Sequence, residues 1–71
     1  MASEVCAEMV ANVLTLAVVV GDPVGSGDTL VVLESMKMEI PVLADVEGVV
    51  VEVRVREGDV VQEGDVLVVL G

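Results

Sequence analysis

The sequence contains no phenylalanine, tyrosine, tryptophan or histidine, and its one cysteine is Cys6. A single cysteine rules out a disulfide framework within the chain, and without histidine no Cys/His metal site can be written. We therefore expect no metal, and we expect Cys6 to be a small apolar residue in a reducing compartment. With 71 residues and neither a disulfide nor a structural metal, the chain must gain its stability from efficient packing of a small core.

Positive charge is almost as scarce, because Lys37, Arg54 and Arg56 stand against 13 acidic residues and leave a net charge of −10. Such a surface repels phosphate backbones, and no aromatic ring is present to stack on a base, so nucleic-acid binding is not expected. The longest mostly apolar run, residues 9–20, falls short of the roughly 20 residues of a spanning helix, and the first residues show no secretory signal. We expect one soluble, cytoplasmic domain over residues 1–71, with no membrane partner.

Valine dominates the apolar residues, which make up 55% of the chain. Its branched Cβ favours extended backbone, so the sequence predicts an all-β fold. Alternation places one set of residues on core faces: Leu14, Leu16 and Val18; Ile40, Val42 and Ala44; and Val51, Val53 and Val55. Pro41 is acceptable only at a sheet edge or a strand start, and residues 5–7 are a candidate short first strand. The apolar runs 30–33 and 67–70 leave the buried face ambiguous.

The chain repeats itself. Residues 21–33 match residues 58–70 without a gap, at an offset of 37 positions, and the match extends upstream to the alternating residues just named. Each half contains paired Gly-Asp turns between strands. Two similar halves predict a fold with approximate two-fold symmetry.

The Gly-Asp pairs predict structural turns. Glycine supplies a positive φ, which we expect at Gly27 and Gly64, and the aspartate side chain is expected to bond its own backbone two residues on. Glycine-rich loops can also hold phosphate, but Asp22 and Asp28 repel an anion and no helix follows.

The segment 34–39 reads Glu-Ser-Met-Lys-Met-Glu and holds the only lysine of the chain. Lys37 lies between Met36 and Met38, where one apolar run ends and the next begins. Taken alone, Met-Lys-Met indicates no more than a hairpin with a solvated lysine at its tip. Its position between two matched halves makes it the candidate functional residue.

This segment, set between two Gly-Asp-x-Val-x-x-Gly-Asp-x-Leu halves with Gly48 before a later strand, closely resembles the biotinyl domain family. The resemblance covers nearly the whole chain. It implies a flattened barrel-sandwich of two four-stranded antiparallel sheets with pseudo-two-fold symmetry. It also places the lysine on an exposed hairpin and both termini at the opposite end.

The resemblance implies that biotin is attached covalently to Lys37. Met36 and Met38 are then the flanking recognition residues, Glu34 closes the preceding strand, and Ser35 stands where the family more often has alanine. A biotin protein ligase would attach the cofactor. The chain would then act, without catalysis of its own, as the carboxyl carrier between a biotin carboxylase and a carboxyltransferase. An acyl-CoA carboxylase, as in fatty acid biosynthesis, is the expected setting.

Two alternatives remain open. Lipoyl domains share the fold, so the chain is alternatively a lipoyl carrier of a 2-oxoacid dehydrogenase or glycine-cleavage system, although the two methionines favour biotin. The other alternative is an unmodified binding domain that uses its acidic face and surplus exposed valines.

Overall fold

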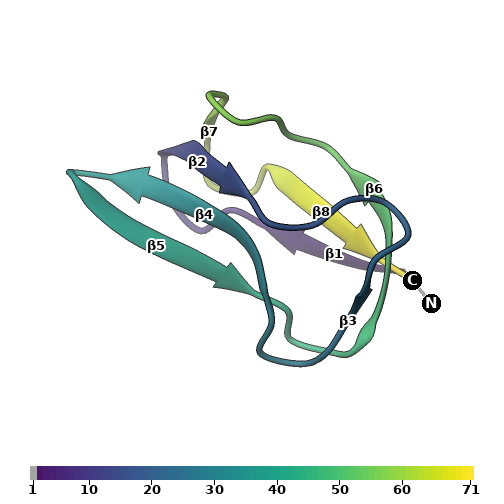
Figure 1. Ribbon diagram of the computed structural model, residues 1–71. Helices are drawn as coiled ribbons and strands as arrows, with labels where there is room; N and C mark the ends of the chain where they lie inside the picture. The colour runs from purple at the N-terminus through teal and green to yellow at the C-terminus, as the bar shows by residue number, and fades with distance from the viewer. Residues whose placement is uncertain (1) are drawn as a thin grey trace.

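The computed structural model describes residues 2–71, which form eight β-strands in two four-stranded antiparallel sheets. The strands are β1 (Ser3–Cys6), β2 (Ala11–Leu16), β3 (Pro23–Val24), β4 (Thr29–Ser35), β5 (Met38–Leu43), β6 (Gly48–Val53), β7 (Val60–Val61) and β8 (Val66–Leu70). One sheet has the order β1-β8-β6-β3 and the other β5-β4-β2-β7 (Figure 1). The predicted fold class is therefore confirmed. No helix in residues 2–71 is long and apolar enough to cross a membrane.

The predicted two-fold symmetry is visible in the strand order. Each of β1 to β4 has a counterpart four strands later in the chain. Exchanging every strand for its counterpart converts the order β1-β8-β6-β3 into β5-β4-β2-β7. The hairpin between β4 and β5 and the paired ends of β1 and β8 lie at opposite ends of a molecule of 32 × 17 × 17 Å (Figure 1). At the end opposite the hairpin, the symmetric position is taken by the paired ends of β1 and β8, so the hairpin has no counterpart there.

The core lies between the sheets and consists entirely of aliphatic side chains. The apolar runs whose orientation the sequence leaves open contribute four fully buried leucines at matched positions in β4 and β8: Leu30, Leu33, Leu67 and Leu70. Pro41 lies on β5, an edge strand, as the sequence predicts. The candidate first strand is present as β1, although it begins earlier than predicted, at Ser3.

Both halves break the predicted alternation at the same place. The register of β2 against β4 shifts across Leu14, and that of β6 against β8 shifts across Val51. Each bulge adds one residue and reverses the faces, so that Val13 and Val50 are buried while Leu14 and Val51 are exposed. The prediction that Leu14 and Val51 face the core is therefore wrong. Beyond the bulge, the remaining predicted residues of both strands pack on the core: Leu16, Val18, Val53 and Val55.

Four turns of one design connect the strands, over residues 19–22, 25–28, 56–59 and 62–65. The third residue of each is a glycine with φ between 91° and 98°, which confirms the expectation for Gly27 and Gly64. The fourth is an aspartate whose Oδ2 accepts the N–H of the first residue at 2.7 to 3.0 Å. The bond thus runs back three residues, and the predicted bond two residues forward is wrong. A positive φ at the glycine brings the aspartate beside the first residue of its own turn.

The turns also join the two halves of the chain. The Gly21 N–H donates to the Val50 carbonyl at 2.7 Å, and the matched Gly58 N–H donates to the Val13 carbonyl at 2.8 Å. A second reciprocal pair runs from Gly27 and Gly64 to the other half. Because these hydrogen bonds run from each half to the other, the hairpin between β4 and β5 extends from two halves that are bonded to each other.

Candidate functional site

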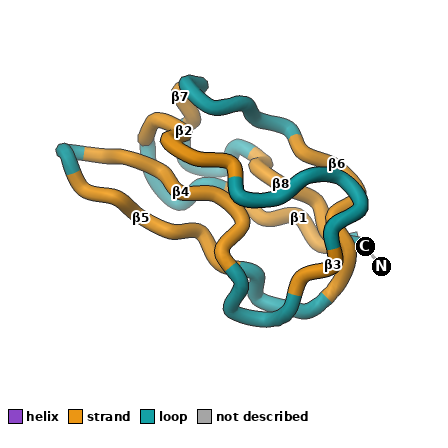
Figure 2. The backbone as a smooth tube through the Cα atoms, viewed as in Figure 1, coloured by secondary structure: helices purple, strands orange, loops and turns teal. Residues whose placement is uncertain are grey.

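The site is the two-residue turn Met36-Lys37, which joins β4 and β5 (Figure 2). Ser35 pairs with Met38 to close the hairpin, and φ is +53° at Met36 and +64° at Lys37. Positive φ at both central residues is the signature of a type I′ turn, whose twist matches that of the flanking strands. Asn-Gly usually fills this turn, because other residues lose about 1–2 kcal/mol each in a left-handed conformation. The hairpin therefore carries strain at its tip.

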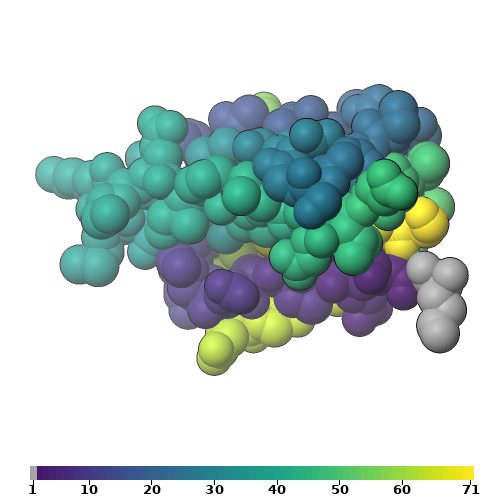
Figure 3. All heavy atoms as spheres, turned by 90° about the horizontal axis from the view of Figure 1, so that it is seen from below, coloured from purple at the N-terminus to yellow at the C-terminus, as the bar shows by residue number. Residues whose placement is uncertain are grey.

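Lys37 is exposed, and among residues 2–71 no hydrogen bond or ion pair holds its ammonium group. Met36 beside it is 91% exposed. In the space-filling view the hairpin, in teal, projects well beyond the rest of the molecule (Figure 3). A lysine held in a fixed turn, with nothing competing for its amine, is open to an enzyme that must reach it.

Two carboxylates stand close to the turn. Glu34 and Glu39 lie directly opposite each other on β4 and β5, one pair behind the closing pair Ser35 and Met38. Like charges at such cross-strand positions destabilise a sheet, and no cation forms an ion pair with either in residues 2–71. The hairpin thus combines backbone strain with charge repulsion, and neither contributes to the stability of the domain.

An open hollow of about 280 Å³ lies against the hairpin. Its lining comes from three separate parts of the chain: Val10, Ala11 and Asn12; Glu34, Ser35, Met36 and Lys37; and Val60. The sheet order brings them together, because β2 lies between β4 and β7. All the sequence-predicted site residues except Met38 therefore line one concave surface, and Met38 closes the turn beside it.

Sequence reasoning missed two residues at this hollow, Val10 and Val60. Both are exposed valines among many, and nothing in their sequence surroundings separates them from ordinary strand formers. The pairing of Asn12 with Val60 is what places them near Lys37. Only the order of the strands in the sheet identifies these two valines as neighbours of Lys37.

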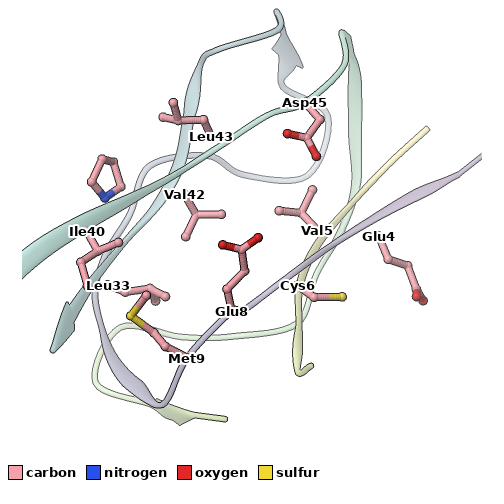
Figure 4. A pocket seen from close by; sticks show the side chains of 11 residues that line it. Glu4, Val5, Cys6, Glu8, Met9, Leu33, Ile40, Val42, Leu43 and Asp45 are labelled. Atoms are coloured by element: carbon pink, nitrogen blue, oxygen red, sulfur yellow. The ribbon is translucent and has the colours of Figure 1, made fainter. Parts of the chain in front are cut away.

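A larger hollow, of about 360 Å³, lies away from Lys37 between the edge strands β1 and β5. Glu8 and Asp45, which are matched positions of the two halves, both line it, together with Val5 and Val42 (Figure 4). It is the seam where the two symmetric sheets meet without pairing. Because Lys37 does not line it, we do not assign the functional site to this larger hollow.

The fold and the tip together define a carrier-type domain, all-β and presenting one lysine on a strained hairpin. Residues 1–70 match the biotin/lipoyl family described as "Biotin-requiring enzyme", and the chain belongs to that family. The chain is a biotinyl domain, and the predicted cofactor, covalently bound biotin, is confirmed.

Individual proteins agree with this membership. The chain is 59% identical over 70 residues to the biotinylated protein TB7.3 homolog of Mycobacterium leprae, covering 99% of both chains. It is 49% identical over 63 residues to the biotin/lipoyl attachment protein of Bacillus subtilis, covering 89% of this chain and 86% of that one. Among solved structures, a single-chain, multi-domain long-chain acyl-CoA carboxylase matches 96% of this chain with 35% identity and a TM-score of 0.89. Only 7% of that protein is covered, so the domain corresponds to a small part of it.

Proposed function

We propose that Lys37 is the residue that carries biotin, and that the loaded domain shuttles a carboxyl group between two active sites of a biotin-dependent carboxylase. The observation that carries the proposal is the position of the only lysine of the chain. It stands exposed and unpaired at the tip of a projecting type I′ hairpin, in a domain of the biotinyl family. No second lysine in the sequence competes for the modification.

Attachment requires a new amide bond between Nζ of Lys37 and the carboxyl carbon of biotin. The neutral amine is the nucleophile, one proton leaves the nitrogen, and the activating group placed on the carboxylate by a biotin protein ligase departs. We assign the base for this step to the ligase, and no carboxylate forms an ion pair with Lys37 among residues 2–71. The contribution of the domain is to hold the amine in a fixed turn away from the rest of the surface.

When bound, biotin supplies a ureido nitrogen that takes up a carboxyl group at one active site and gives it up at another. The chain then adds no catalysis of its own. It keeps the cofactor near a biotin carboxylase and a carboxyltransferase, which raises the effective concentration of the arm at both sites. An acyl-CoA is the acceptor we propose, because the matched acyl-CoA carboxylase contains a domain of this fold.

The test uses the purified domain, a biotin protein ligase, biotin and MgATP, followed by a biotin carboxylase with ¹⁴C-bicarbonate. We expect acid-labile label on the parent protein and none on Lys37→Arg, which keeps the charge but not the nucleophilic amine. Label on Lys37→Arg, or no label on a fully biotinylated parent, would contradict the proposal. A parallel reaction with lipoate and a lipoate ligase decides the alternative: efficient lipoylation without biotinylation would make the chain a lipoyl carrier.

A further inference from the structure

The surface around Lys37 is more apolar than a solvated hairpin requires. Val10 is 62% exposed and Val60 is 67% exposed, and both line the same hollow as Lys37 and the nearly fully exposed Met36. A monomer gains nothing from leaving branched apolar side chains in water at its tip. Contiguous exposed apolar surface of this kind marks a site of interaction.

The size of an interface explains why the hairpin alone is insufficient. A specific complex of standard size buries about 800 Å² on each partner, which is more than a sixth of the 4443 Å² surface of this domain. Three neighbouring side chains, those of Met36, Lys37 and Met38, are too few to supply an interface of that size, which takes about 20–30 residues on each side. Any enzyme that brings its active site onto Lys37 must therefore cover neighbouring elements, and the hollow shows which ones adjoin the turn.

We propose that Val10 and Val60, together with Met36, form the apolar centre of the surface that the biotin protein ligase covers when it modifies Lys37. The inference rests on the proposed function, since it assumes that Lys37 is acylated by that enzyme. The ligase face that fits has an apolar centre and a cationic rim. The rim follows from Glu34 in the lining and from the net charge of −10 on the chain.

The chain provides its own matched control. Val19 and Val20 are 64% and 62% exposed, nearly the same as the two valines at the tip. They lie in the turn 19–22, which bonds to Val50, next to the end of β6 that pairs with Gly71. This is the end of the molecule opposite Lys37. If exposure alone mattered, both valine pairs would respond alike.

The experiment compares Val10→Thr/Val60→Thr with Val19→Thr/Val20→Thr. Threonine keeps the branched Cβ, the strand preference and the zero charge, but it replaces one methyl group by a hydroxyl that an apolar interface must bury. We expect kcat/KM of ligase-catalysed biotinylation to fall at least about tenfold for the tip pair, through KM with kcat unchanged, and to stay close to the parent value for the control pair. Acetylation of Lys37 by a small reagent should proceed equally in all three proteins, which shows that the amine itself is unaltered.

The outcomes separate the two claims. If the parent is biotinylated at Lys37 and both pairs behave alike, the tip surface is not the ligase contact and the inference is wrong. If the parent itself is not biotinylated, the proposed function fails first. Far-ultraviolet circular dichroism checks that both variants fold. If the tip pair does not fold, Val10→Ala/Val60→Ala against Val19→Ala/Val20→Ala poses the same question, with the same outcomes.

Discussion

The turn 25–28 contains two glycines that the same substitution should affect in opposite directions. Gly27 has φ of +91°, and a Cβ added there would meet nothing within 4 Å. Gly25 has no positive φ, and its added Cβ would lie 3.7 Å from Oδ2 of Asp28, an ordinary contact. Neither alanine clashes, and neither removes a backbone hydrogen bond. The comparison therefore isolates the backbone conformation.

The magnitude follows from the left-handed conformation of Gly27. An alanine there costs about 1–2 kcal/mol in the folded state. At Gly25 an alanine instead restricts the unfolded chain and stabilises the protein by about 0.4–1 kcal/mol. In a domain of this size, 1 kcal/mol shifts Tm by roughly 4–8 °C. Gly27→Ala should thus melt roughly 4–16 °C below the parent, while Gly25→Ala should melt roughly 2–8 °C above it.

The assay is thermal and urea unfolding followed by far-ultraviolet circular dichroism. Aromatic fluorescence is not an option, because the chain has no tryptophan, tyrosine or phenylalanine. Gly64→Ala, the matched position in the second half, should repeat the loss, because its φ is +92° and its Cβ is equally unobstructed. Equal melting of Gly25→Ala and Gly27→Ala would refute the argument that positive φ fixes these glycines.

Two further predictions concern the hairpin and the aspartates. The double variant Met36→Asn/Lys37→Gly places the usual type I′ residues in the turn. Its free energy of unfolding should rise by about 1–3 kcal/mol, and biotinylation should be lost. If the double variant melts no higher than Lys37→Ala, the argument that the turn is strained is wrong. Asp65→Ala removes the acceptor of the Gln62 N–H and should lower the free energy of unfolding in urea by about 1 kcal/mol. Glu63→Ala makes an equal charge change in the same turn and should stay within about 0.5 kcal/mol of the parent. Equal losses in the two variants would show that only charge matters.

Much of the fold could be predicted from the sequence because the two halves share the same order of glycine, aspartate and apolar residues. The offset repeat predicts the two-fold symmetry, since equal sequences with equal turn residues adopt equal local structures. The four Gly-Asp pairs predict the turns, because only glycine takes a positive φ without cost. The lone lysine between Met36 and Met38 predicts the tip of the hairpin, which the structure places there.

The remaining features depend on pairing, which a single strand does not show. The bulges at Leu14 and Val51 interrupt the alternation without any glycine or proline to mark them, and each is defined only against its partner strand. The hollow beside Lys37 joins β2, β4 and β7, so Val10 and Val60 acquire their position from sheet order alone. Interaction surfaces assembled from several strands are invisible until the topology is known.

The most direct test of the account is the mass of the protein isolated from cells with an active biotin protein ligase, followed by peptide fragmentation. The account predicts one adduct, equal to biotin less one water, on Lys37 between Met36 and Met38. A lipoyl adduct at Lys37, an adduct on any other residue, or an unmodified chain in the presence of active ligase would contradict it.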